Sequence, residues 1–131
     1  MTNGAENLQK GEMLAALKPF RPVAYYDKHL DAIRVQIADC SIFEDRRNKL
    51  ISIYLPNHAD GKLADIVGFS IKGVRYLLNK LQWPHDGAIQ LAGFLDALVK
   101  EYPTESMLMV ADFYRQLGDS APAEVKYQEA A

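Results

Sequence analysis

The stretch that decides the fold is VAYYDKHLDAIRVQI, residues 23–37. Its second half places Ile33, Val35 and Ile37 on one side of the chain and polar residues between them, which is the pattern of a half-buried β-strand. Residues 23–26 form a shorter strand before it. The five residues DKHLD in between have the length and the aspartates of a hairpin loop. The stretch therefore predicts an antiparallel hairpin.

Two more strands follow with the same two-residue period, LISIYL at residues 50–55 and IVGFSIK at residues 66–72. A short piece of edge strand also fits residues 41–43. The period then lengthens to that of a helix, with apolar residues at Val74, Leu77, Leu78 and Leu81. We expect this short helix to pack on the sheet.

The last third of the chain has helical periodicity. Residues 87–102 and 105–117 each carry one apolar stripe, and Pro103 separates them. Thr104 is placed to cap the second helix, and Gly118 to end it. The residues after Gly118 are expected to fray.

These patterns predict an α+β protein: a four-stranded antiparallel sheet with one packed helix, followed by a C-terminal helical hairpin. Strands come first and helices later, and the loops are too short for crossover helices, so the sheet is expected to be antiparallel. We expect a loosely ordered arm over residues 1–18 and a single domain over residues 19–131. Within it, residues 19–82 supply the sheet and its helix, and residues 83–131 a helical extension.

Composition is that of one globular domain, with 131 residues, 49% of them hydrophobic and 24% charged. Cys40 is the only cysteine, which excludes an internal disulfide and a cysteine-based zinc cluster and suits a reducing cytoplasm. Neither a signal peptide nor an apolar run of about 20 residues is present, so we expect a cytoplasmic protein away from membranes. Residues 1–82 carry 12 basic against 9 acidic side chains, and residues 83–131 carry 3 against 8.

One resemblance accompanies these patterns. Tyr26-Asp27, then Asp31, Ile33 and Val35, and later Val67-Gly68-Phe69 with Ile71, resemble a small bacterial family of domains of unknown function. The resemblance covers residues 23–78. It implies an antiparallel sheet followed by a helix and carries no activity, cofactor or catalytic residue. The connection around residues 57–65 and the helical tail depart from the family pattern.

The same hairpin raises a question of chemistry. Tyr26, Asp27, His29 and Asp31 could supply a base and an orienting carboxylate, but aspartates that bind loop amides explain them better. His58 and Asp60, in the connection after residue 55, could bind a ligand or a metal with His29 and Asp31. Their spacing fits no calcium or zinc motif, so a solvated loop is favoured and neither a metal nor a cofactor is predicted.

Basic residues offer a third possibility. Arg46, Arg47 and Lys49 could bind phosphate or nucleic acid. Against nucleic acid stands the sequence pI of about 5.9. No glycine-rich phosphate loop and no nucleophile elbow occur, and Asp39 beside Cys40 is not an activating neighbour for a thiol nucleophile. No catalytic residue is predicted.

The apolar stripes of the helical hairpin need cover, either from the sheet or from a second copy of the chain. The predicted interface residues are Leu91, Phe94, Leu95, Leu98, Met107, Val110 and Tyr114. We therefore expect a non-enzymatic interaction or regulatory module that forms a homodimer. The alternatives are a small-ligand or metal-binding protein, or weak enzyme, using His29, Asp31 and His58, and a phosphate-binding or nucleic-acid-binding protein.

Overall fold

The computed structural model describes residues 21–56 and 66–128. The arm predicted for residues 1–18 lies outside these ranges. The elements within them are β1 (Val23–Asp27), β2 (Ala32–Gln36), β3 (Ile42–Arg46), β4 (Ile51–Pro56), β5 (Gly68–Lys72), α2 (Val74–Leu81), β6 (Gly87–Gln90), α3 (Leu91–Glu101), α4 (Glu105–Gln116), the 3₁₀ helix η2 (Gly118–Ser120) and β7 (Glu124–Tyr127).

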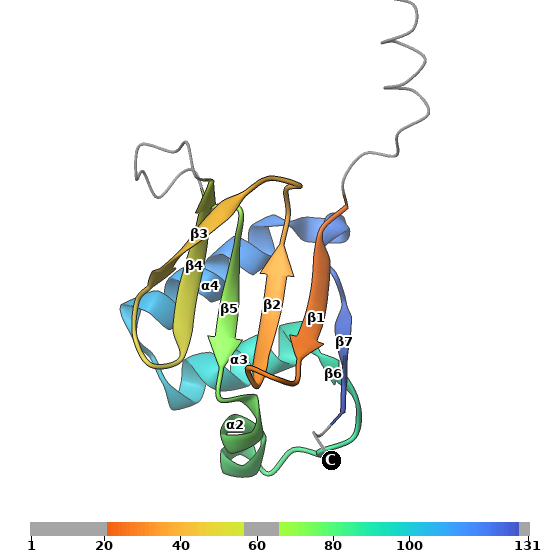
Figure 1. Ribbon diagram of the computed structural model, residues 1–131. Coiled ribbons are helices and arrows are strands. Elements are labelled where there is room, and N and C mark those ends of the chain that lie inside the picture. Colours follow the sequence, from red (N-terminus) through yellow and green to blue (C-terminus); the bar gives the residue numbers. More distant parts are fainter. Residues whose placement is uncertain (1–20, 57–65, 129–131) are drawn as a thin grey trace, which may run out of the picture.

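Five strands form the main sheet, in the order β1-β2-β5-β4-β3, and every neighbouring pair is antiparallel (Figure 1). The antiparallel α+β prediction is thus confirmed, whereas the counts of four strands and one packed helix are wrong, because the described residues form a five-stranded main sheet and three α-helices that share its core. The additional strand is β3, which pairs with β4 from Ile42 to Arg46. Polar Glu44, Asp45 and Arg46 hide its strand character in the sequence.

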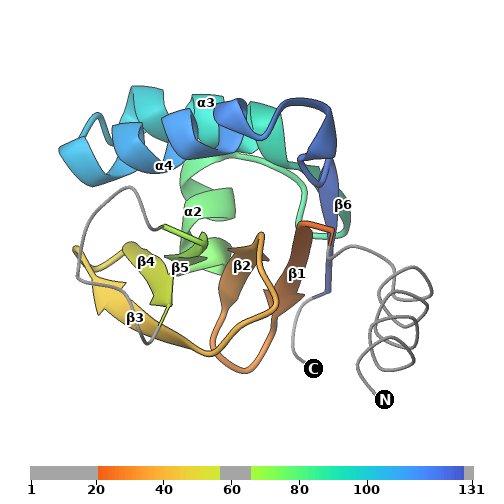
Figure 2. The same cartoon turned by 90° about the horizontal axis from the view of Figure 1, so that it is seen from above.

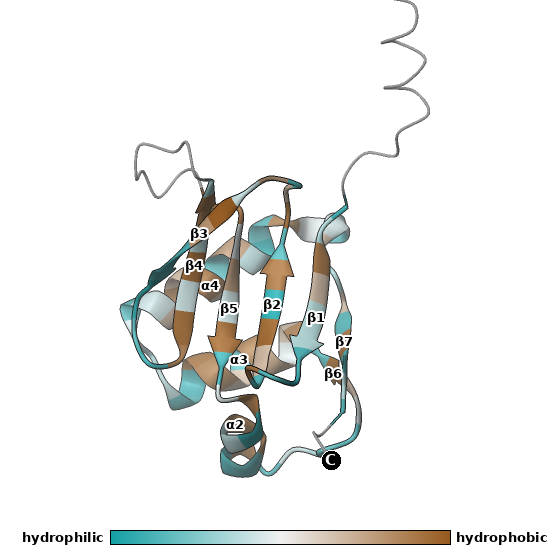
Figure 3. Cartoon of the chain, viewed as in Figure 1, coloured by the Kyte–Doolittle hydropathy of each residue, from teal (hydrophilic) through white to brown (hydrophobic). Residues whose placement is uncertain are grey.

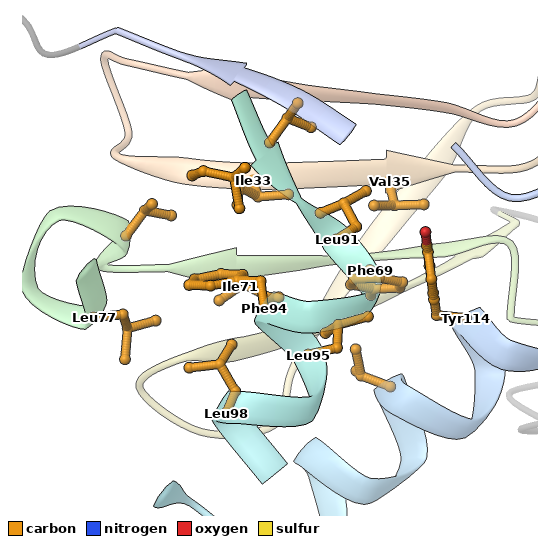
Figure 4. Close-up of a cluster of buried hydrophobic side chains, with 14 of the residues drawn as sticks. Ile33, Val35, Phe69, Ile71, Leu77, Leu91, Phe94, Leu95, Leu98 and Tyr114 are labelled. Atoms are coloured by element: carbon orange, nitrogen blue, oxygen red, sulfur yellow. The ribbon is translucent and has the colours of Figure 1, made fainter. Parts of the chain in front are cut away.

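The helices α3 and α4 lie together on one face of the sheet, and α2 packs at one end of it (Figure 2). Ile33 and Val35 of β2 and Phe69 and Ile71 of β5 point from the sheet toward α3 and α4 (Figure 4). These side chains are at most 1% exposed. Burial of this apolar surface is the main force that holds helices and sheet together.

The hydropathy of the residues along each strand also separates apolar from polar positions (Figure 3). Brown and teal bands alternate along β2, which reflects its alternation of apolar and polar residues, whereas most of β3 carries polar colours. No helix in the described ranges has both the length and the apolar character needed to cross a membrane.

A glycine holds β5 tightly against β2. A Cβ atom on Gly68 would lie 2.2 Å from the Val35 carbonyl oxygen and 3.0 Å from Cδ2 of Tyr54. The first distance is shorter than real Cβ contacts ever are, and the second is at the tight end of what they show. Only glycine therefore permits this close pairing and lets the Tyr54 ring lie over the strand.

The C-terminal part differs from its prediction at two points. Residues 87–90 were expected to be helical, but they form β6 and pair with β7, in a part of the chain that was expected to fray. The helix α3 begins only at Leu91. In contrast, Thr104 caps α4 as predicted, since its hydroxyl accepts the Met107 N–H at 3.2 Å, and Gly118 follows the helix with a φ of 58°.

The segment from residue 83 onward belongs to the same core as the sheet. Its helices contribute Leu91, Phe94 and Leu98 to the cluster that also contains the inner face of the strands. The last strand, β7, runs beside β1 (Figure 1), and the rings of Tyr26 and Tyr127 lie 4.6 Å apart. The predicted helical extension is therefore an integral part of the domain.

Candidate functional site

The YYDKHLD stretch forms the turn of a hairpin. The Asp27 carboxylate accepts the backbone N–H groups of His29 at 3.0 Å and of Leu30 at 3.2 Å. An aspartate that binds amides two and three residues ahead is a common way to stabilise a turn. The His29 side chain is exposed. The turn interpretation is confirmed.

Asp31 has a structural task that the sequence did not reveal. Its carboxylate accepts the Tyr26 hydroxyl at 2.6 Å and the backbone N–H of Arg75 at 3.1 and 3.2 Å. The Asp31 carbonyl accepts the N–H groups of Gly73 and Val74, at 2.9 and 3.2 Å. Asp31 therefore caps the start of α2, where Gly73 offers no side chain of its own.

The phenol of Tyr26 is held protonated by this arrangement. Burial first, and then the hydrogen bond and the charge of Asp31, raise the pKa of Tyr26 well above its ordinary value. Tyr127 packs against Tyr26, and the His85 ring lies edge-on to Tyr127 with centroids 6.4 Å apart. His85, Tyr127 and Tyr26 therefore form a row of neighbouring rings beside the first hairpin.

The predicted set of His29, Asp31, His58 and Asp60 does not come together as a described site. His58 and Asp60 lie outside the described residues. Neither His29 nor Asp31 lines any of the three best-formed hollows among the described residues. Across residues 21–56 and 66–128, no three His, Cys, Asp or Glu side chains gather closely enough to hold a metal ion.

The three predicted phosphate-binding residues have separate surroundings. Arg47 pairs with Asp45 at 3.0 Å, and Arg46 donates from Nε to the Asn48 carbonyl at 3.3 Å. Lys49 lines a pocket instead. Glu44 also pairs with Arg34 and Lys72 on the sheet. The described basic residues therefore do not form one continuous surface of positive charge without nearby carboxylates.

The predicted interface residues lie in the core. All seven are at most 7% exposed within the single chain, and Figure 4 shows several of them between the helices and the sheet. The apolar stripes of α3 and α4 are therefore covered by the chain's own sheet. The prediction that these side chains form an exposed association surface is wrong. They are Leu91, Phe94, Leu95, Leu98, Met107, Val110 and Tyr114.

An open pocket of about 370 Å³ lies where the start of β4 meets α2 and the junction between α3 and α4. We call it the tyrosine pocket. Its walls are mainly aromatic and aliphatic, with few polar groups. The lining residues are Asn48, Lys49, Leu50, Tyr76, Tyr102, Thr104 and Met107.

Two phenols and one ammonium group give this pocket its chemistry. Tyr76 is 59% exposed, so its ring offers a free surface. The Tyr102 hydroxyl is buried without a hydrogen bond of acceptable geometry; burial, and then the nearby Tyr76 hydroxyl, raise the pKa of Tyr102. Lys49 forms no ion pair or hydrogen bond within the described ranges. The pocket thus combines apolar contact area with available donors.

A larger hollow of about 530 Å³ lies beside α3, α4 and η2, but the polar groups around it are already engaged. Arg115 pairs with Asp96 at 3.3 Å. The Tyr114 hydroxyl donates to the Pro122 carbonyl at 2.6 Å. Few donors remain there to orient a ligand, so the tyrosine pocket is the better candidate.

Sequence reasoning missed Tyr76 and Tyr102. Tyr102 continues the apolar stripe predicted for residues 87–102, and that stripe predicts a core position. Tyr76 lies between the apolar positions of α2. A large exposed aromatic on a short helix was the available signal, since such side chains often mark binding surfaces. The meeting of α2 with the α3–α4 junction could not be read from the sequence.

No protein family model, curated protein or solved structure matches this chain. The resemblance to a bacterial family of unknown function, carried by Tyr26-Asp27, Asp31 and Val67-Gly68-Phe69, stays a prediction.

Proposed function

We propose that the protein is a non-enzymatic binding module for a small molecule that joins an apolar body to one negatively charged group. The observation that carries this proposal is the tyrosine pocket, in which Tyr76, Tyr102 and Lys49, an ammonium with no ion pair to any described residue, line the same hollow. Ligand sites are typically apolar hollows of about 300–1,000 Å³ with a few polar groups that fix orientation. The tyrosine pocket falls at the small end of that range.

Each residue has a separate role in this proposal. The rings of Tyr76 and Tyr102, with Leu50 and the buried Met107, supply contact area for the apolar body. The ammonium of Lys49, on its flexible stem, pairs with the anion. The Tyr102 hydroxyl, which has no partner of good hydrogen-bond geometry among the described residues, bonds to the ligand.

The test uses the full chain with naphthalene-2-sulfonate, which unites a flat apolar body with one anionic group. We expect shifts in NMR amide signals to concentrate at residues 48–50, 76 and 102–107. Replacing Tyr76 with Ala should weaken binding by about tenfold because a large part of the contact area is lost. Lys49→Gln should weaken it by about two- to fivefold, the size of an exposed ion pair.

Lys80→Gln is the matched control, because Lys80 is an exposed lysine in the last turn of α2 and does not line the pocket. It should leave the affinity unchanged. An uncharged naphthalene alcohol should bind the wild type and Lys49→Gln equally. Shifts that gather elsewhere, or an affinity that Tyr76→Ala does not alter, would refute the proposal.

The homodimer, a protein partner, the cytoplasmic location and a bacterial origin remain predictions from the sequence. With the predicted interface residues in the core, the homodimer now has no assigned surface. Of the three predicted phosphate-binding residues, Lys49 alone takes part in the proposed site.

A further inference from the structure

The helices α3 and α4 leave one face of the sheet uncovered (Figure 2). On that face the strand registers align a row of polar side chains across all five strands. The strand registers place Arg34 of β2 beside Ser70 of β5, and Ser70 beside Ser52 of β4. Tyr25 of β1 and Arg46 of β3 end the row. The row alternates with the buried core positions, so its members share the face that the helices leave uncovered.

Several hydrogen-bonding groups in this region are buried and unpaired. Ser52 and Ser70 have no exposed surface, and Tyr54 is 1% exposed. Within the described residues, the three hydroxyls and the Nε of Arg34 have no hydrogen-bond partner. Buried polar groups are nearly always paired, so four unpaired donors in one place need a physical explanation.

Two of the other unpaired groups, on Ser70 and Arg34, lie close to the Tyr54 phenol. The Tyr54 ring lies over Gly68, which has no side chain to displace it. Burial raises the pKa of Tyr54 to about 12, and the Ser70 hydroxyl and the Arg34 charge are close enough to oppose part of that rise. The Ser70 hydroxyl and the Arg34 guanidinium therefore both lie near the Tyr54 phenol.

A carboxylate from another strand covers this place. Glu44 of β3 contacts Arg34 and Lys72, each at 3.4 Å. In a flat sheet, β2 and β3 would be three spacings apart, about 14 Å. The strand β3 must therefore curl over this face, in keeping with its oblique course in Figure 1. Both contacts are longer than the roughly 2.8 Å of a tight charge-assisted hydrogen bond.

We propose that Arg34, Ser52, Ser70 and Tyr54 form a binding site for a phosphate group, and that Glu44 occupies this site as an internal carboxylate in the free chain. Hydroxyl and guanidinium donors on three strands suit the several acceptor oxygens of a phosphate better than the two of a carboxylate. The site lies on the sheet face, separate from the tyrosine pocket.

The balance of charges around Arg34 explains why Glu44 controls the access of phosphate to the site. Arg34 and Lys72 are balanced by Glu44 and by Asp27, whose carboxylate lies 3.8 Å from Arg34 Nε. When Glu44 swings out, one excess positive charge remains for the incoming anion. The movement needs no change in the core, because Glu44 sits on an edge strand that pairs with β4 alone and its side chain is 31% exposed.

The experiment titrates inorganic phosphate into the full-length chain and follows the amide signals of residues 34, 52, 54 and 70 by NMR. Glu44→Ala should bind phosphate at least about tenfold more tightly than the wild type, because the competing carboxylate is gone. Asp45→Ala is the control: it removes the same charge from the same strand, but Asp45 lies in register with Ile53 on the other face. Its affinity should equal that of the wild type.

Two further variants guard against an effect of general charge or of misfolding. Glu44→Gln, which keeps the size of the side chain, should also bind more tightly than the wild type. Adding Arg34→Met to Glu44→Ala should abolish the gain. The proposal is overturned if the Glu44 variants bind no more tightly than Asp45→Ala, or if the gain survives without Arg34. A response confined to residues 48–50 would assign phosphate to the tyrosine pocket and equally overturn it.

Discussion

The Asp31 carboxylate accepts the backbone N–H of Arg75, a residue 44 positions further along the chain. This bond joins the first hairpin to the start of α2, and the Tyr26 hydroxyl shares the same carboxylate. One residue therefore connects the end of the hairpin loop, the cap of the helix and a half-buried phenol.

Replacing Asp31 with Ala should lower the free energy of unfolding by about 2–3 kcal/mol, since a helix cap is lost and the Tyr26 hydroxyl loses its acceptor. Asp31 also has a φ of 50°, which alanine tolerates poorly. Urea denaturation measures the loss. Asp31→Asn should cost less, because asparagine keeps an oxygen acceptor and accepts this backbone conformation. Asp39→Ala, at an exposed aspartate, should change stability by less than about 0.5 kcal/mol.

Gly68→Ala should destabilise the protein by about 3 kcal/mol or more, because the added methyl group would overlap the Val35 carbonyl. Gly93→Ala provides the contrast. A Cβ there would meet Trp83 at 3.7 Å, an ordinary contact, and alanine is favoured over glycine inside a helix by about 1 kcal/mol. Thermal unfolding of the two variants should shift in opposite directions. Equal destabilisation by both would contradict the close approach of β5 to β2.

A chain that ends at Gln82 should not fold. It would lack α3 and α4, whose Leu91, Phe94 and Leu98 cover the inner face of the sheet. Circular dichroism and the dispersion of NMR signals would show an unfolded or aggregated fragment. A soluble, cooperatively folded fragment would mean that the sheet and α2 form a complete domain and that the helices are an addition to it.

Stability should fall in alkaline solution. Burial raises the pKa of Tyr54 from 10.0 to about 12, so the folded state favours the neutral phenol. This contribution is fully present below pH 10, where folded and unfolded chains are both protonated. It is lost as pH rises from 10 to 12, because the unfolded chain releases its proton first. The loss from Tyr54 is about 2 kcal/mol. Denaturation in Tyr54→Phe should show a shallower decline.

A strand could be predicted from the sequence where one of its faces is apolar and the other polar. It could not be predicted where both faces carry polar residues. Ile33 and Val35 alternate with polar residues, so β2 was found. In β3 the positions of Glu44 and Asp45 both hold charged side chains, because β3 curls over the polar face of the sheet instead of covering the core. Its weak signal at residues 41–43 was the only warning.

Strands β6 and β7 were missed for another reason. Ala88 and Ile89 fit the apolar stripe of the following helix as well as a strand, and Gly87, with a φ of 81°, gives the decisive sign of a break. The alternation of Val125 and Tyr127 is only four residues long. Each strand exists because the other pairs with it, and such mutual pairing is a tertiary property.

The candidate site was the least predictable part. Lys49 was identified as an anion-binding residue, but its partners Tyr76 and Tyr102 come from elements that meet only in the folded chain. His29 and Asp31 are neighbours in sequence and attracted attention for that reason. Polar residues that are close in sequence therefore marked a turn. The tyrosine pocket, in contrast, is formed by residues that are far apart in sequence.

The contact between Tyr26 and Tyr127 has a consequence for synthesis on the ribosome. The first strand of the sheet receives its neighbour β7 from the far end of the described chain, and the helices that cover the core come only shortly before it. Contacts between residues so distant in sequence form slowly. The apolar inner face of the sheet therefore stays uncovered until α3, α4 and β7 have left the exit tunnel, and for that interval it is a natural substrate for chaperones.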